Sequence, residues 1–210
     1  KVNVTDYITW YADERPALFE ALTFEQINDA ILDYSIPKVE GQIALAAIKK
    51  IQGHRRVVAP TKYLQGTRTL YYHNAGGYWI KAFDFRPYYR SLAHPEKVHT
   101  TISELKVPDD ASMVTFLALL SSSTFYFYWK AVTDARHVYP SDIASMPILL
   151  PLPQPLIEEL SKLTADLMTA YKANSTLITY GKAEVQKFTV APCKPIIDEI
   201  DRVLARHYGF

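Results

Sequence analysis

A run of 19 residues without a charged side chain, between Asp110 and Lys130, is the strongest constraint on the fold. Its length is close to that needed to span a bilayer as a helix. Serines and threonines interrupt the run, and residues 121–124 divide it into two short apolar pieces. No basic cluster marks a cytoplasmic flank, as membrane spans usually have. We therefore expect two buried elements joined at the serines, in preference to a membrane span.

The composition is that of an ordinary globular chain. With 210 residues, of which 49% are hydrophobic and 21% charged, disorder, collagen-like repeats and coiled coil are excluded. The single cysteine, Cys193, excludes an intrachain disulfide and a cysteine-rich zinc site. The first residues lack the pattern of a signal peptide, so we expect a cytoplasmic protein. Because the chain opens without Met, we expect a fragment or a processed chain.

Periodicity and turn residues predict the secondary structure. Helices are expected over residues 13–34, 42–52, 113–120, 156–171 and 196–207, and residues 124–131 are expected to form a second short element after 113–120. Strands over 67–73 and 78–85 flank a Gly-bearing turn and form a hairpin, and 137–143 and 146–150 are extended. Three prolines at 151, 153 and 155 mark a boundary. The three tryptophans at 10, 79 and 129 are expected in the core.

Charge is distributed unevenly along the chain. Residues 38–101 hold eleven basic and three acidic residues, a net charge of +8, whereas the rest of the chain carries −7. The same segment holds four of the six histidines and many of the tyrosines. Lys and Arg displace counterions from phosphates, and aromatic side chains stack on bases, so this pattern is typical of nucleic-acid binding. An internal charge balance, an acidic protein and a small anion remain alternatives.

No catalytic motif is visible. The chain lacks a P-loop, a G-x-G-x-x-G turn, a G-x-S-x-G elbow and an H-E-x-x-H helix. His94 and His99 have the wrong spacing and setting for a helical metal pair. We therefore do not expect an enzyme that acts alone.

Several cations sit where they can reach a ligand. Lys81 lies in a predicted strand, where an inward lysine is costly, so we expect it to face solvent or ligand. Arg86 and Arg90 flank a tyrosine pair and either contact guanine or stack on those tyrosines. The candidate DNA-binding residues are Lys49, Lys50, Arg55, Arg56, Lys62, Arg68, Lys81, Arg86, Tyr88 and Arg90.

Five stretches, taken in order, resemble one family. They are residues 71–82, the leucine-rich and aromatic run 117–129, TDARHV at 133–138, DIASMPI at 142–148, and the ending KPIIDEIDRVLARHYGF at 194–210. Together they resemble the C-terminal specificity part of large adenine-N6 DNA methyltransferases and fused restriction–methylation enzymes of bacterial restriction–modification systems. Ser121 and Ala135 stand where that family has Asn and Gly. The resemblance covers residues 36–210.

The resemblance implies an α+β fold, in which a small, irregular, mostly antiparallel sheet flanked by helices resembles the recognition domains of Type I specificity subunits. It implies a target recognition domain at 36–150 and a helical C-terminal element at 151–210, and the helical pattern within residues 13–34 predicts a helical lead-in at 1–35. It implies binding to double-stranded DNA, with Arg136 in the family's turn as a further candidate contact. S-adenosylmethionine and catalysis belong to a separate domain marked by a Pro-Pro loop, and this chain has no Pro-Pro pair. We therefore expect no cofactor in this chain, and a catalytic methyltransferase domain as its partner.

Two other classes of function remain open. The amphipathic helices at 156–171 and 196–207 could form a protein-interaction module. Alternatively, Tyr71, Tyr72, Tyr78 and Trp79 could form a stacking platform for RNA or single-stranded DNA.

The charge pattern predicts a salt dependence. If about 4–6 of the eleven cations meet phosphates, the logarithm of the DNA-binding constant should fall with the logarithm of salt concentration with a slope of roughly −4 to −5. Charge reversal of Arg55 and Arg56 should flatten the slope by about one unit per lost contact. Fluorescence anisotropy over a salt series measures both slopes, and an unchanged slope would remove the two arginines from the candidates.

Overall fold

The protein is described by a computed structural model that covers residues 2–6, 8, 10–27, 36–54, 64–75, 79–148 and 150–210. Its α-helices are α1 (Leu18–Ala21), α2 (Gln42–Gly53), α3 (Asp110–Leu120), α4 (Ser123–Val132), α5 (Pro140–Ser145), α6 (Gln154–Ala173) and α7 (Lys194–Tyr208). Its strands are β1 (Val2–Val4), β2 (Glu25–Ile27), β3 (Arg68–His73), β4 (Ala82–Phe83), β5 (Tyr89–Ser91), β6 (Ile102–Val107), β7 (Ser175–Tyr180) and β8 (Ala183–Phe188). The chain is α+β, as predicted.

The strands of the described chain form small antiparallel sheets. The central sheet has the order β4-β3-β6, and the outer sheet has the order β5-β8-β7. In the central sheet, β3 pairs with β6 over its whole length, with Arg68 opposite Val107 and His73 opposite Ile102. A two-stranded ribbon of β1 and β2 lies near the N-terminus.

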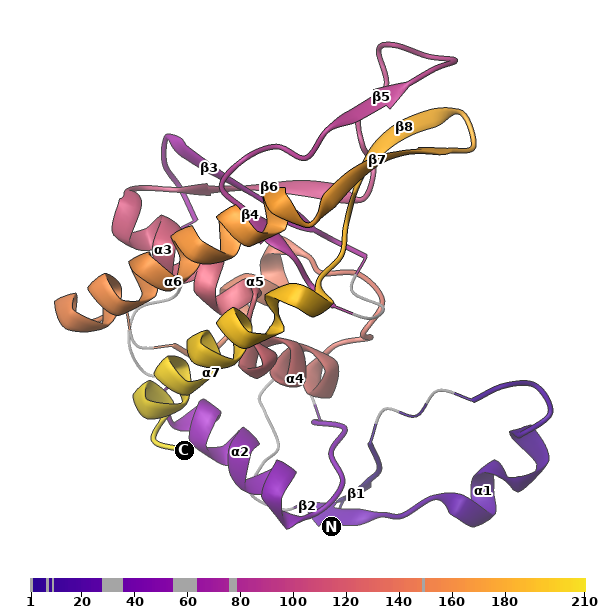
Figure 1. Ribbon diagram of the computed structural model, residues 1–210. Coiled ribbons are helices and arrows are strands. Elements are labelled where there is room, and N and C mark those ends of the chain that lie inside the picture. The colour runs from indigo at the N-terminus through magenta and orange to yellow at the C-terminus, as the bar shows by residue number, and fades with distance from the viewer. Residues whose placement is uncertain are drawn as a thin grey trace.

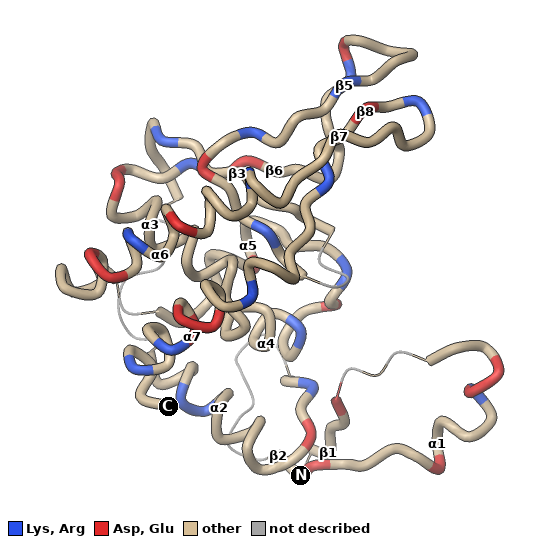
Figure 2. Tube along the Cα trace, viewed as in Figure 1, with Lys and Arg blue, Asp and Glu red and all other residues tan. Residues whose placement is uncertain are grey.

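Helices pack in layers beneath the central sheet (Figure 1). Helix α3 contacts β3 and β4, α6 packs against α3 and α7, and α7 also packs against α4. The apolar sides of α6 and α7 are buried, whereas their outer sides carry charges of both signs (Figure 2). This arrangement explains the amphipathic patterns from which both helices were predicted. The division into residues 1–35, 36–150 and 151–210 stays a prediction. Residues on both sides of Pro151 contribute to one hydrophobic core.

The uncharged run forms two buried elements, as predicted, and both are helices. Side chains of α3 such as Phe116 and Leu119 are fully buried, and so are Phe125 and Trp129 of α4. The chain bends by 68° between the two helices. Ser122 caps α4, because its hydroxyl oxygen accepts a hydrogen bond from the Phe125 amide at 3.0 Å. No single helix in the described ranges is long and apolar enough to cross a membrane, and α3 and α4 reach that length only as this bent pair.

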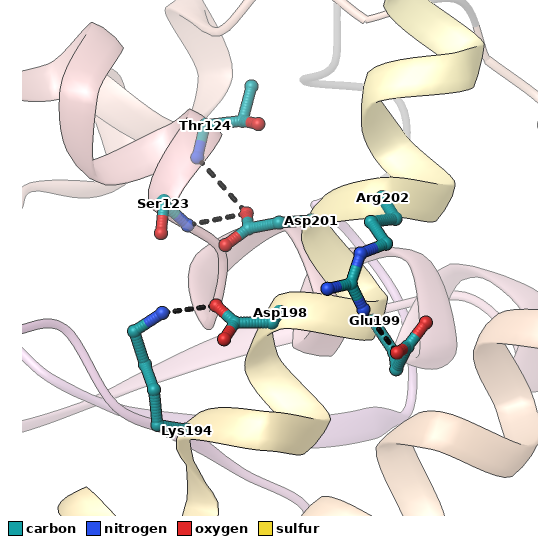
Figure 3. Close-up of polar contacts among 7 residues, drawn as sticks. All are labelled: Ser123, Thr124, Lys194, Asp198, Glu199, Asp201 and Arg202. Carbon is teal, nitrogen blue, oxygen red and sulfur yellow. Dashed lines mark hydrogen bonds and ion pairs between the residues drawn. The ribbon is translucent and has the colours of Figure 1, made fainter.

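A carboxylate from α7 ties that helix to the start of α4 (Figure 3). Asp201 Oδ1 accepts hydrogen bonds from the amides of Ser123 at 2.7 Å and Thr124 at 3.4 Å. These amides belong to the first turn of α4, where backbone donors lack helical partners and the helix dipole favours a negative charge. Burial raises the pKa of Asp201, and the hydrogen bonds act in the opposite direction.

The helix predicted over residues 13–34 is not present as such. Helical structure in this segment covers Arg15–Ala17 and α1, Leu22 is extended, and β2 follows in pairing with β1. Leu18 and Leu22 are only partly buried, so the apolar stripe has too little surface to pack against to stabilise a long helix. Trp10, which we predicted in the core, is 46% exposed. Residues 28–35 lie outside the described part of the chain.

Two further elements differ from their predictions. The second hairpin strand is short: Ala82 and Phe83 pair with β3. The predicted alternation between faces is present, since Lys81 and Phe83 line one cavity whereas Ile80 and Ala82 do not. Ala82 and Phe83 are both buried, so the sheet is covered on both faces here. Residues predicted as extended form α5, because Pro140 occupies the first turn and the Asp142 carboxylate accepts from the Tyr139 amide.

Removal of the Asp201 carboxylate tests its role. Asp201→Ala is expected to lower the free energy of unfolding by about 1–2 kcal/mol, because two amides of α4 lose their acceptor. Asp201→Asn keeps an acceptor oxygen and is expected to retain most of the stability. Urea unfolding at pH 7 measures both. Asp198→Ala is the matched control, since Asp198 pairs with the exposed Lys194 on its own helix; equal losses at both positions would contradict the assignment.

Candidate nucleic-acid interface

The outer sheet joins two distant parts of the chain. After α6, strands β7 and β8 form a hairpin whose turn contains Gly181 at a φ of +59°, a conformation that favours glycine. Strand β5 then pairs with β8, with Tyr89 opposite Val185 and Ser91 opposite Ala183. The outer sheet projects from the layered helices at the end of the molecule opposite α2 (Figure 1).

Three of the predicted DNA-binding residues lie at this sheet. Arg86, Tyr88 and Arg90 are all exposed. The Tyr88 hydroxyl donates to Glu184 Oε2 at 3.2 Å, and Arg90 lies 3.8 Å from the same carboxylate. Both contacts are exposed and therefore weak, so the two side chains can exchange Glu184 for another acceptor. The arginines keep their charges available at the surface.

A shallow groove of about 330 Å³ lies beside these residues. Its lining includes Arg86, Tyr88, Tyr89, Lys97 and His99. The turn of the adjoining β7–β8 hairpin and strand β5 each carry a basic residue, as Figure 2 shows. We call this region the outer-sheet surface; its members are Arg86, Tyr88, Arg90, Lys97 and Lys182.

Lys81, also predicted, lines a cavity between the central and outer sheets. The cavity has a volume of about 500 Å³, and His73, His99 and Thr101 share its lining with Lys81. Burial lowers the pKa of Lys81. It also lowers the pKa of His73 to about 4, and the charge of Lys81 acts in the same direction. Burial lowers the pKa of His99 as well.

The remaining described candidates lie elsewhere. Arg68, at the far end of β3, forms an ion pair with Asp110 at 2.5 Å. Lys49 and Lys50 are on α2, where the Lys50 ammonium donates to the Gly209 carbonyl. Arg136 is exposed in a turn. Its neighbour His137 forms an isolated antiparallel β-bridge with Ala75, just after the end of β3. The structure therefore brings Arg86, Tyr88 and Arg90 together at the outer sheet, places Lys81 in the adjoining cavity, and separates the others from them. Arg55, Arg56 and Lys62 lie outside the described residues.

The aromatic platform considered for single strands is not assembled as predicted. Tyr72 is fully buried, and Trp79 packs against the core with its ring 5.4 Å from that of Tyr126. Tyr71 is partly buried, and Tyr78 lies outside the described ranges. A buried ring cannot stack on a base, so Tyr72 cannot serve in such a platform, and among the other described members Tyr71 and Trp79 are half-buried.

The sequence prediction missed the hairpin and its cations. Lys182 and Lys187 belong to strands and a turn that were not predicted. The only local signal is Gly181-Lys182 between two runs rich in β-branched and aromatic residues, a spacing typical of a two-residue hairpin turn. Within the described chain, no group of three or more His, Cys, Asp or Glu side chains is arranged to hold a metal ion.

Comparison with known proteins adds no assignment: no protein-family model, no curated protein and no solved structure matches the chain.

The lowered pKa of His73 predicts a loss of stability in acid. The unfolded chain protonates this imidazole near pH 6.5, whereas the folded chain does so near pH 4, so stability falls as the pH drops through that window. Relative to His73→Asn, the wild type should lose roughly 1–2 kcal/mol, since the ring is only partly buried. Urea unfolding at pH 7, 5.5 and 4.5 measures the difference. Parallel pH profiles for the two proteins would contradict the prediction.

Proposed function

We propose that the chain binds double-stranded DNA as the target recognition domain of a restriction–modification adenine-N6 methyltransferase. The observation that carries the proposal is the projecting outer sheet, where the pairing of β5 with β8 brings Arg90 close to the hairpin turn that holds Lys182, from a distant part of the sequence. The resemblance of residues 36–210 to that family supports it independently. The small antiparallel sheets flanked by helices support a relationship with the recognition domains of Type I specificity subunits.

The shape of the outer sheet favours duplex DNA as the ligand. The major groove of B-DNA admits a two-stranded β-ribbon, and the β7–β8 hairpin is such a ribbon with Lys182 in its turn. Arg86 and Arg90 provide the planar donors that pair with guanine O6 and N7. Lys97, in the groove beside Arg86, adds a cation for a phosphate.

In this proposal, methyl transfer belongs to a partner domain. The catalytic methyltransferase domain binds S-adenosylmethionine and takes the target adenine out of the base stack. The chain described here supplies sequence recognition and phosphate contacts, which hold the duplex in register for that step.

A double variant tests the outer-sheet surface. Arg86→Gln/Lys182→Gln should weaken duplex binding at physiological salt and flatten the salt slope by about two units, because each lost phosphate contact removes about 0.9. Fluorescence anisotropy with duplex DNA, the matching single strand and duplex RNA over a salt series measures this. Lys162→Gln, an exposed lysine on α6, is the control and should leave the slope unchanged.

Two results would contradict the proposal. A preference for single strands or RNA would exclude duplex recognition. A larger effect of Lys49→Gln/Lys50→Gln than of the double variant would move the interface to α2.

A further inference from the structure

We propose that the cavity between the central and outer sheets is a binding site for a nucleotide, with the phosphate at Lys81 and His99 and the base against aromatic side chains. Its volume of about 500 Å³ lies within the range of small-molecule sites, about 300–1,000 Å³. The inference concerns the cavity alone and does not require that the outer-sheet surface bind duplex DNA.

One wall of the cavity offers hydrogen-bond donors to an anion. Thr101 links the two imidazoles: its hydroxyl lies 3.0 Å from His99 Nδ1 and 3.4 Å from His73 Nε2. The Thr101 amide donates to His99 Nδ1 at 3.3 Å, so a neutral His99 ring carries its proton on Nε2 and can donate it. His73 instead donates from Nδ1 to the Ala75 carbonyl at 3.1 Å and holds Thr101 in place through Nε2. The ammonium of Lys81 lies on the same wall and acts electrostatically on His73.

The charge of Lys81 has no counterion at the cavity. Among the described residues that line it, none is Asp or Glu. Burial is the cause of the lowered pKa of Lys81, and an arriving anion would offset that desolvation. A phosphate suits this arrangement because it accepts several charge-assisted hydrogen bonds at once. The positive charge of Lys81, with no acidic residue in the lining, would repel a cationic ligand.

The rest of the cavity is apolar and aromatic, which calls for a planar body attached to the anion. Phe188 is part of the lining and is half-buried, and the fully buried Phe83 packs behind it with the ring centroids 4.7 Å apart. The Tyr89 ring lies 4.9 Å from that of His99, and Tyr180 is 78% exposed on β7. Aromatic side chains of this kind stack on nucleobases without regard to base identity. Phosphate at one wall and a stacking surface at the other define a nucleotide.

The ligand can come from two sources. Tyr89 and His99 also line the groove beside Arg86, so the cavity adjoins the outer-sheet surface. A free mononucleotide and an unstacked nucleotide of a DNA strand therefore present the same chemistry to it.

Calorimetric titration with adenosine 5′-monophosphate, adenosine and inorganic phosphate tests the site. The monophosphate should bind at least about tenfold more tightly than either fragment, because only it uses both walls. Lys81→Met should weaken its binding by about tenfold or more, and Tyr180→Ala by about tenfold. Lys81→Met removes a desolvated charge and keeps the chain length, so folding is preserved. Lys162→Met, remote on α6, is the matched control.

A second titration, with DNA duplexes, distinguishes a free mononucleotide from an unstacked nucleotide of a DNA strand. If a strand supplies the nucleotide, a duplex with one unpaired adenosine should bind more tightly than a fully paired duplex, and the monophosphate should compete. If the free nucleotide is the ligand, the monophosphate binds and the two duplexes bind with equal affinity.

The inference is overturned if the monophosphate fails to bind at millimolar concentration, or if it binds no better than adenosine and its binding is unaffected by Lys81→Met. Nucleotide binding without duplex binding would overturn the proposed function and leave this inference intact.

Discussion

The burial of an uncharged run of 19 residues is the constraint on which the structure depends. The run folds as α3 and α4, bent by 68° so that both helices lie inside the same core. The bend leaves the amides at the start of α4 without helical partners. Asp201 of α7 supplies the acceptor for two of them, so the docking of α7 and the position of α4 are set by one carboxylate. Helix α6 then fills the space between α7 and α3.

This helical framework determines where the outer sheet stands. Strand β7 begins two residues after the end of α6, and α7 follows β8 after a short connection. Both ends of the hairpin are therefore fixed to helices that are buried along one side. The hairpin in turn gives β5 its partner, which places Arg90 beside Glu184. Of the cations at this surface, Arg90 is on β5 itself, and Lys182 lies in the hairpin turn that these helices hold in place. Arg86 and Lys97 lie in the connections before and after β5.

Local patterns in the sequence identified the elements whose burial is one-sided. Helices α2, α6 and α7 show a clear apolar stripe, and the serines between α3 and α4 marked their junction, so these were predicted correctly. The N-terminal stripe failed because the described segment gives Leu18 and Leu22 little to pack against. Strands β7 and β8 were missed because most of their residues are exposed or half-buried on both faces, which leaves no alternation to detect.

The candidate site was harder to predict than the fold, because its residues are brought together by tertiary pairing that leaves no local pattern in the sequence. The uneven charge distribution pointed to the segment that holds Lys81, Arg86 and Arg90. It could not show that Lys182 joins them, because that neighbour is set by pairing between β5 and β8. The same distribution included Lys50 and Arg68, which the fold carries to other faces. Tertiary pairing, not local composition, decides which cations share a surface.

The pairing of β5 with β8 also constrains how the chain folds. It joins residues 96 positions apart, as between Tyr88 and Glu184. The entropy of closing so long a loop must be offset before these few residues gain from pairing, which favours late formation, after the local helices. The cavity wall formed by β8 then exists only in the fully folded chain. A chain still emerging from the ribosome, before residue 188 is available, has the cations of β5 but neither the sheet nor the cavity.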